Sequence, residues 1–182
     1  MSIDVTRLEA DDTWNSHVER SPQAGRFHRA EALSVLADHA DATLYRYAGY
    51  KGEEPVGVFP VFEVTRGPVT GAFSPPPQLG VPFLGPALCN QAKLKQRKAE
   101  RRHRAFLEGC LDHVAADVAP GYSQFKTGPA YEDLRPFKWH DCDVAPQYTY
   151  VIDLGADEEA VLDRFSSDAR RNVTDGDGVP ER

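Results

Sequence analysis

The chain has 182 residues, with 28 acidic and 21 basic side chains and a net charge of −7. This length suits one ordinary domain with a sizeable core. The sequence contains neither an apolar run long enough to span a membrane nor the charged-then-apolar start of a secretory signal. Its three cysteines are too few and too scattered for a disulfide framework. We therefore expect a soluble, cytoplasmic protein without a membrane partner.

Arginine supplies 15 of the basic residues and lysine only 6. An acidic, lysine-poor surface suits high salt, because salt screens the repulsion between neighbouring carboxylates. A halophilic source is therefore a hypothesis, and unchanged stability after dialysis to low salt would refute it.

The first 40 residues favour one short strand and two helices. Residues 3–8 alternate as a strand does. Asp11 or Asp12 is placed to cap a helix that follows. Residues 29–40 have apolar side chains on one side and polar ones on the other, which predicts an amphipathic helix.

An antiparallel hairpin is predicted next. Residues 43–50 and 56–65 are apolar and β-branched, and the turn-forming residues 51–55 separate them. Pro60 cannot donate a hydrogen bond to a ladder, so it marks a sheet edge, a bulge or a place where two strands part.

The middle of the chain combines a stiff loop with a long helix. Residues 73–86 contain five prolines, which disfavour regular structure. Residues 91–119 form the longest helical candidate, which Pro120 ends. A strand over 122–126 and a short turn or helix over 132–139 follow.

The closing segment is predicted to be an internal strand followed by one capped helix. Residues 148–154 have apolar side chains at both alternating sets of positions, and residues 157–173 begin with three acids and end near two arginines. Together these elements predict an α/β (α+β) fold with a mixed, largely antiparallel sheet flanked by helices.

Several motifs occur in an order that resembles the FemAB-like branch of the GNAT acyltransferase superfamily. The most specific is the closing block, Tyr148-Thr149-Tyr150-Val151-Ile152-Asp153-Leu154 with the helix ending on Arg170-Arg171-Asn172. The others are Trp14, Phe27-His28, Glu54-Pro55-Val56-Gly57-Val58-Phe59-Pro60, Ser74-Pro75-Pro76, Leu84-Gly85-Pro86 and Asp133-Leu134-Arg135-Pro136-Phe137. The resemblance covers residues 10–173 and matches only the first of the family's two lobes.

This resemblance implies an N-acyltransferase that moves an acyl or aminoacyl group onto a small-molecule or peptide amine. Residues 1–173 would form one GNAT-like lobe, and residues 174–182, which depart from the family pattern, a polar, flexible tail. A second lobe or a second copy of the chain would be a partner, and we expect weak or no turnover from this chain alone. In the superfamily the acyl donor enters where two strands part.

The donor implied by the resemblance is acyl-coenzyme A or an aminoacyl-tRNA. The chain lacks the Arg/Gln-x-x-Gly-x-Gly/Ala turn with which GNAT enzymes hold the coenzyme A pyrophosphate at a helix N-terminus. This departure removes direct support for coenzyme A and leaves the tRNA donor open.

Candidate substrate contacts are arginines and aromatic residues near the predicted element ends. No residue is assigned as catalytic base, and each candidate also fits an ordinary structural role. They are Arg29, Arg135, Trp139, Tyr148, Tyr150, Arg170 and Arg171.

The sharpest charge feature is a basic segment over 93–104, in which Glu100 is the single acid. It predicts contact with phosphates, either of a nucleotide-like donor or of a nucleic acid. It also fits a solvated helix face that pairs with the protein's own acids. Its bases are Lys93, Lys95, Arg97, Lys98, Arg101, Arg102 and Arg104.

Two other functions remain open: a non-catalytic module whose basic segment binds nucleic acid or a partner subunit, and a degenerate structural lobe. We expect no metal, because neither the Cys110 and His113 pair nor the cluster over 140–143 has a recognised ligand spacing.

Overall fold

The computed structural model describes residues 3–149, 151, 153, 155 and 157–176. The chain divides into two compact units, Met1–Val144 and Ala145–Arg182, which are described separately. The expected single lobe over residues 1–173 stays a prediction.

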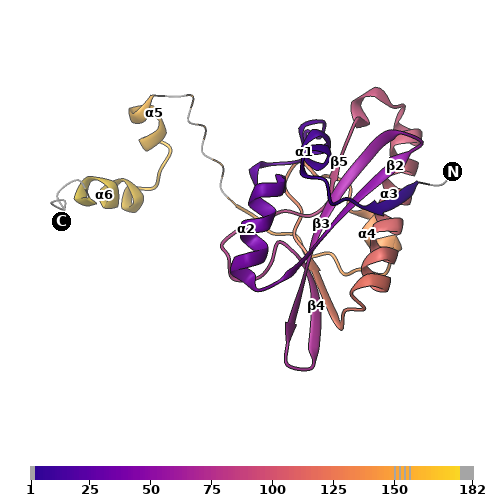
Figure 1. The fold of residues 1–182 in the computed structure, drawn as a ribbon. Helices are drawn as coiled ribbons and strands as arrows, with labels where there is room; N and C mark the ends of the chain where they lie inside the picture. The colour runs from indigo at the N-terminus through magenta and orange to yellow at the C-terminus, as the bar shows by residue number, and fades with distance from the viewer. Residues whose placement is uncertain (1–2, 150, 152, 154, 156, 177–182) are drawn as a thin grey trace. The chain divides into compact units, whose positions relative to one another are not determined.

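The first unit is a mixed sheet with helices on both faces (Figure 1). The strand order is β1-β2-β3-β4-β6, with β5 also paired to β3. All neighbours are antiparallel except β4 and β6, which are parallel. The fold class predicted from the sequence is thereby confirmed. The elements are β1 (Asp4–Arg7), α1 (Asp11–Glu19), η1 (Arg26–His28), α2 (Ala30–Ala40), β2 (Thr43–Lys51), β3 (Glu54–Arg66), β4 (Val69–Ser74), β5 (Ala87–Leu88), η2 (Gln91–Lys93), α3 (Gln96–Asp117), β6 (Tyr122–Phe125) and α4 (Arg135–Trp139).

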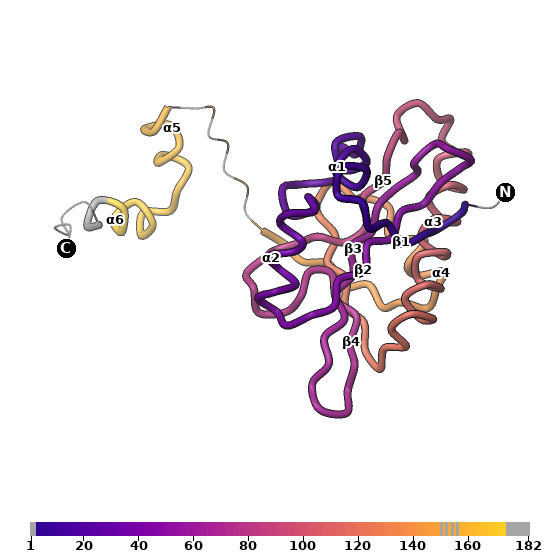
Figure 2. Tube along the Cα trace, in the orientation of Figure 1, coloured from indigo at the N-terminus to yellow at the C-terminus, as the bar shows by residue number. Residues whose placement is uncertain are grey.

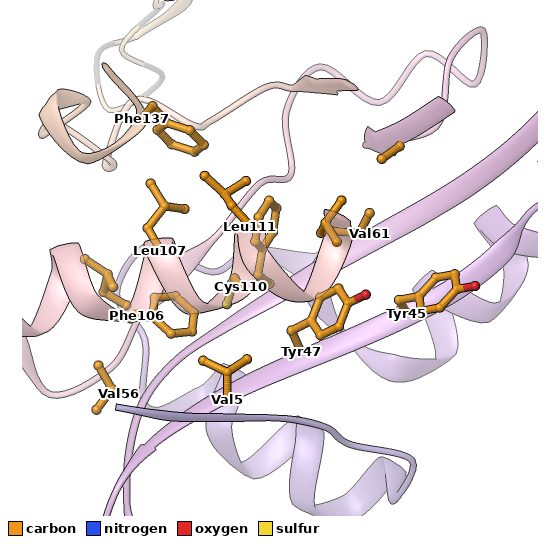
Figure 3. Close-up of a cluster of buried hydrophobic side chains, with 14 of the residues drawn as sticks. Val5, Tyr45, Tyr47, Val56, Val61, Phe106, Leu107, Cys110, Leu111 and Phe137 are labelled. Atoms are coloured by element: carbon orange, nitrogen blue, oxygen red, sulfur yellow. The ribbon is translucent and has the colours of Figure 1, made fainter. Parts of the chain in front are cut away.

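Alternation along β3 builds a separate apolar core on each face of the sheet. Phe59 and Val61 point to the face that α3 and α4 cover, and Val58 and Phe62 point to the face that α1 and α2 cover. Figure 3 shows the first of these cores, with Phe106 among the side chains that α3 contributes. The central strand is therefore buried on both faces, which explains its nearly continuous apolar sequence.

Two glycines let α3 approach the sheet closely. Gly49 of β2 and Gly57 of β3 lie opposite each other in the ladder. A Cβ at either position would lie within 3.0 Å of the Phe106 ring, at 2.3 Å from Gly49 and 2.7 Å from Gly57. The fully buried Phe106 side chain therefore occupies the space that two side chains would otherwise fill.

Pro60 lies where β4 and β5 part along β3. β5 pairs with β3 at Gly57 and Val58, and β4 pairs with it from Phe62 onward, so Pro60 lies between the two pairings. The Val56 carbonyl accepts a hydrogen bond from Cys89 N–H on this side. By alternation the Pro60 nitrogen faces the same side, where the ladder needs no donor. Since β3 is a central strand, Pro60 does not mark a sheet edge. It marks the place where two strands, β4 and β5, part.

The helix predicted to be capped by Asp11 or Asp12 is present as α1, but the capping prediction is wrong, because the N-cap residue is Ala10 and both aspartates lie in the first turn. The remaining predictions for this unit hold with two omissions. The strands over 3–8, 43–50, 56–65 and 122–126, and the helices over 29–40 and 91–119, correspond to elements of the structure, although the last begins as η2 before α3. β4 and β5 were not predicted. Figure 2 traces the chain as it leaves β4, crosses the proline-rich segment and returns beside β3 as β5.

The second unit corrects the prediction for the closing segment. The described residues from 145 to 155 lie in no strand, and Tyr148 is 93% and Val151 90% exposed. An internal strand is therefore wrong for these residues, because alternation cannot supply the neighbouring strand on which a strand depends. Tyr150, Ile152 and Leu154 lie outside the described residues.

One helix over 157–173 is also wrong, because the structure has two, α5 (Glu158–Leu162) and α6 (Ser167–Gly176). Asp157 caps α5 by accepting the Ala160 N–H at 2.9 Å. Ser166 Oγ then accepts the Ala169 N–H at 3.3 Å, so a second capping residue restarts the helix. Because α6 extends to Gly176, the tail predicted over 174–182 begins in a helix, and its remainder lies outside the described residues.

Candidate functional site

The N–H and C=O of Leu88 both point away from β3 and are bound by side chains rather than by another strand. Cys89 N–H bonds to β3, so the neighbouring Leu88 faces the opposite side. Its N–H donates to Gln23 Oε1 at 2.8 Å, and its carbonyl accepts from Ser21 Oγ at 2.8 Å. Both side chains come from the connection between α1 and η1. The strand edge that β5 turns away from β3 is thus satisfied by residues 65 and 67 positions away in the sequence.

Gln23 also bonds to the chain segment that follows β6. Its Nε2 donates to the Ala130 carbonyl at 3.1 Å. β4 and β6 pair in parallel, and a single parallel bridge joins Leu84 to Thr127. Beyond that bridge β5 and the segment after β6 separate, and the carboxamide of Gln23 spans between them. We call this place, between Leu88 N–H and the Ala130 carbonyl, the Leu88–Ala130 gap.

Buried polar contacts fix the Ala130 side of the gap. The next residue, Tyr131, is 5% exposed and its hydroxyl shares a hydrogen bond with His103 Nε2 of α3. The other ring nitrogen of His103 lies 3.8 Å from Asp133 Oδ2. Burial lowers the pKa of His103 to about 4, and the attraction of Asp133 only partly opposes this. A neutral imidazole therefore ties the segment after β6 to α3 at neutral pH.

The basic segment over 93–104 divides into two halves with different surroundings. In the second half, Arg102 pairs with Glu54 at 2.9 Å and Arg104 with Glu108 at 2.7 Å. Arg101 is exposed and takes part in a further interaction. In the first half, four exposed cationic side chains make no hydrogen bond or ion pair within the described part of the chain; they belong to Lys93, Lys95, Arg97 and Lys98.

The free cations lie around the start of α3. Lys95 is the N-cap residue and its side chain makes no cap hydrogen bond. The positive end of a 22-residue helix therefore coincides with four positive side chains. This combination attracts anions, and phosphate groups are the common biological ones.

Trp139 and Arg135, both predicted substrate contacts, lie together. The Arg135 guanidinium is 5.7 Å from the Trp139 ring centroid, and that of Arg104 is 5.1 Å away. Arg135 also pairs with Asp133 at 2.8 Å and Glu100 at 3.0 Å. Trp139 is 49% exposed. The structure thus connects two of the predicted contacts with one base of the basic segment.

The other predicted contacts lie elsewhere. Arg29 precedes α2 and pairs with Glu19 and Glu31 at 3.4 and 3.5 Å. In the second unit, Tyr148 is exposed, Arg170 pairs with Asp163 at 3.4 Å, and Arg171 pairs with Asp168 at 3.4 Å. Tyr150 lies outside the described residues.

The arrangement offers hydrogen-bonding groups and positive charge rather than an evident base. His103 and Tyr131 are too deeply buried to touch a substrate. Within the described ranges, no three metal-ligating side chains come together, and no helix has the length and apolar composition needed to cross a bilayer. Sequence reasoning missed Ser21 and Gln23, because their partners are distant and no local pattern marks them.

Comparison with known proteins gives similarity of fold at low sequence identity. No family model and no curated protein matches the chain. It is similar to the ribosomal-protein-alanine N-acetyltransferase of Brucella melitensis biovar Abortus 2308, at 13% identity and a TM-score of 0.48 over 85% of this chain and 100% of that one. It is also similar to an aminoglycoside acetyltransferase from an uncultured soil metagenomic sample, at 13% identity and a TM-score of 0.46 over 86% and 100%. A protein of Thermus thermophilus is similar at 15% identity and a TM-score of 0.46 over 86% and 100%.

Proposed function

We propose that this chain is the donor-binding lobe of a FemAB-like N-acyltransferase, which transfers an acyl or aminoacyl group to an amine. The observation that carries the proposal is the N–H of Leu88, which points away from β3 and lies in the chain a few residues before the free cations of α3. A donor of this class has an acyl carbonyl at one end and phosphates at the other. The Leu88–Ala130 gap would hold the acyl arm, and the four cations would hold the phosphates.

Acyl transfer needs little more than placement of the amine beside the acyl group and polarisation of the acyl carbonyl. When an amine attacks the acyl carbonyl, negative charge develops on the carbonyl oxygen, and a backbone N–H of fixed direction stabilises it. Leu88 N–H, whose direction the pairing of β5 with β3 fixes, would instead bind an amide oxygen of the donor's arm and so help to place the acyl group for attack. As the new bond to nitrogen forms, the bond between the acyl carbon and the donor's sulfur or ribose oxygen breaks. The proton that the amine loses would pass, directly or through water, to this leaving group, which departs as the thiol of coenzyme A or the hydroxyl of the tRNA.

Coenzyme A binding tests the phosphate contacts. We expect coenzyme A to bind the wild-type chain, and Lys95→Glu/Lys98→Glu to weaken binding about tenfold or more through lost attraction. The matched control is Arg26→Glu/Lys51→Glu, with the same charge change at two bases that make no ion pair in the described structure. Equal weakening by both double variants, measured by calorimetry, would contradict the assignment of the cations.

A second candidate function rests on the same free cations. Four positive side chains that find no partner in the described ranges of an acidic protein also suit a nucleic acid, including the tRNA of an aminoacyl donor. Contact with four phosphates of a single strand predicts that log K falls with log salt at a slope of about −3. Tight tRNA binding with this slope, together with no coenzyme A binding, would favour the nucleic-acid function.

A further inference from the structure

We propose that Gln23 is an internal plug of the Leu88–Ala130 gap, which a ligand bearing secondary amides must displace. The inference rests on the proposed function, since it concerns how the acyl arm enters the same site. It also names the chemistry of that arm: an extended chain with amide groups, such as a pantetheine arm or a peptide.

The carboxamide of Gln23 takes the place of a strand's peptide group. Its oxygen accepts from Leu88 N–H at 2.8 Å and its nitrogen donates to the Ala130 carbonyl at 3.1 Å. A trans secondary amide points its carbonyl and its N–H in opposite directions, as a peptide does between two strands. Such an amide in the gap would make the same two bonds, so it and Gln23 compete for one place.

The surroundings make Gln23 the movable part. Ala130 precedes Tyr131, which the buried contact with His103 holds in place, and Leu88 is held by the pairing of β5 with β3. Gln23 is only half-buried and lies in a connection between helices. Rotation of its side chain frees both backbone groups without disturbing a strand or a core.

Ser21 holds the backbone of Gln23 in place beside β5. Its hydroxyl donates to the Leu88 carbonyl at 2.8 Å and also accepts the Gln23 N–H at 3.2 Å. The backbone of the plug is thereby anchored beside β5 even when the Gln23 side chain swings out. The free protein thus keeps Leu88 N–H bonded until a ligand replaces the carboxamide.

Amide hydrogen exchange tests the plug without any ligand. In a two-dimensional NMR experiment, Gln23→Ala should raise the exchange rate of the Leu88 amide at least about tenfold, because a bonded N–H becomes exposed. The control Gln124→Ala removes an exposed amide side chain of β6 and should leave Leu88 unchanged. The same spectra report whether each variant is folded. Unchanged Leu88 exchange in a folded Gln23→Ala protein would overturn the inference.

Ligand titration separates this inference from the proposed function. Gln23→Ala should bind coenzyme A about tenfold more tightly than wild type does, because two hydrogen bonds no longer need to be broken. Adenosine 3′,5′-bisphosphate, which has phosphates but no amide arm, should bind both proteins equally. Equal affinity of both proteins for coenzyme A would overturn the plug and leave the proposed function standing.

A blocked tetra-alanine peptide distinguishes the two sources of amide. If Gln23→Ala tightens binding of the peptide while coenzyme A binds neither protein, the plug is supported and the coenzyme A donor is refuted. If neither ligand binds either protein, both the plug and the proposed donor site are wrong.

Discussion

Two buried histidines make the first unit sensitive to mild acid. Burial lowers the pKa of His28 and of His103 to about 4 each, from an ordinary value of 6.5. His28 accepts the Gly25 N–H at Nδ1 and faces the Gly85 carbonyl with Nε2 at 3.3 Å. This geometry needs a neutral ring with the proton on Nε2. Protonation would place a hydrogen on the accepting nitrogen and break the first of these bonds.

The sign and size of the effect follow from proton linkage. Because the folded pKa lies below the unfolded one, the unfolded state binds more protons as the pH falls from about 6.5 towards 4. Stability is therefore complete above pH 6.5 and is lost through this window. For a shift from 6.5 to about 4, the loss between pH 7 and pH 5 is about 2 kcal/mol per histidine, or about 4 kcal/mol for both. His17, whose pKa burial also lowers, adds a loss of the same sign.

Urea unfolding at pH 7, 6 and 5 measures this loss. The carboxylates with lowered pKa values, such as Asp133, lose their stabilising effect only at lower pH, so the window isolates the histidines. His28→Asn and His103→Gln should each remove about 2 kcal/mol of the pH dependence, whatever their effect at pH 7. The exposed His39 provides the control His39→Gln. A wild-type loss below about 1 kcal/mol, or variants with unaltered pH dependence, would refute the reasoning.

Two further variants test the packing of α3 on the sheet. Gly57→Ala places a methyl group 2.7 Å from the Phe106 ring and should lower the free energy of unfolding by about 1–3 kcal/mol. The control Gly25→Ala, with no atom within 4 Å of the added methyl group, should change the free energy of unfolding little. Equal effects of the two variants in urea unfolding would contradict the overpacking argument. Glu54→Gln leaves the guanidinium of Arg102, 6% exposed, without its counter-charge and should cost about 2 kcal/mol. Glu54→Gln/Arg102→Met should then cost less than the two single variants together, and strict additivity in the double-mutant cycle would show that the ion pair is not coupled.

Periodicity in the sequence was sufficient to predict a helix or strand wherever that element is long and buried. Leu107, Leu111 and Val114 recur on one face of α3 and Val118 is its C-cap residue, and all four are buried in the structure as the spacing predicts. The hairpin of β2 and β3 follows from two apolar runs around a tight turn in the same way. In both cases neighbours in sequence carry the information.

Prediction failed where the stabilising contact lies far away in the sequence or where an element is very short. β5 has two residues, too few to show an alternating pattern, and it exists because β3 pairs with it. β4 begins after a tight turn in which Gly67 adopts a positive φ of 59°. Its first four residues were assigned to no element, and its last two fall in the loop predicted over 73–86. For the closing segment the error was the opposite one, because a strand was predicted where the structure has none at the described residues. Its alternation suits a strand, but no strand pairing is present at its described residues.

The candidate site shows the same limit, with one exception. Ser21 and Gln23 bond to β5 and to Ala130 across 65 to 107 positions, and no spacing rule points to them. The basic segment was visible in the sequence, but its division was not. Whether a base is neutralised depends on which acids the fold brings to it, and Arg102 meets Glu54 only because α3 packs across the β2–β3 hairpin.

The division of the basic segment bears directly on function. The chain has more acids than bases, so a cation on its surface has many possible partners. The bases that lie further along α3 meet such partners, whereas Lys93, Lys95, Arg97 and Lys98 meet none among the described residues. These four are also the bases nearest in sequence to Leu88, and they surround the positive end of the helix. A solvated, self-paired face therefore accounts for the second half of the segment, whereas the first half is where we propose that an anionic ligand binds.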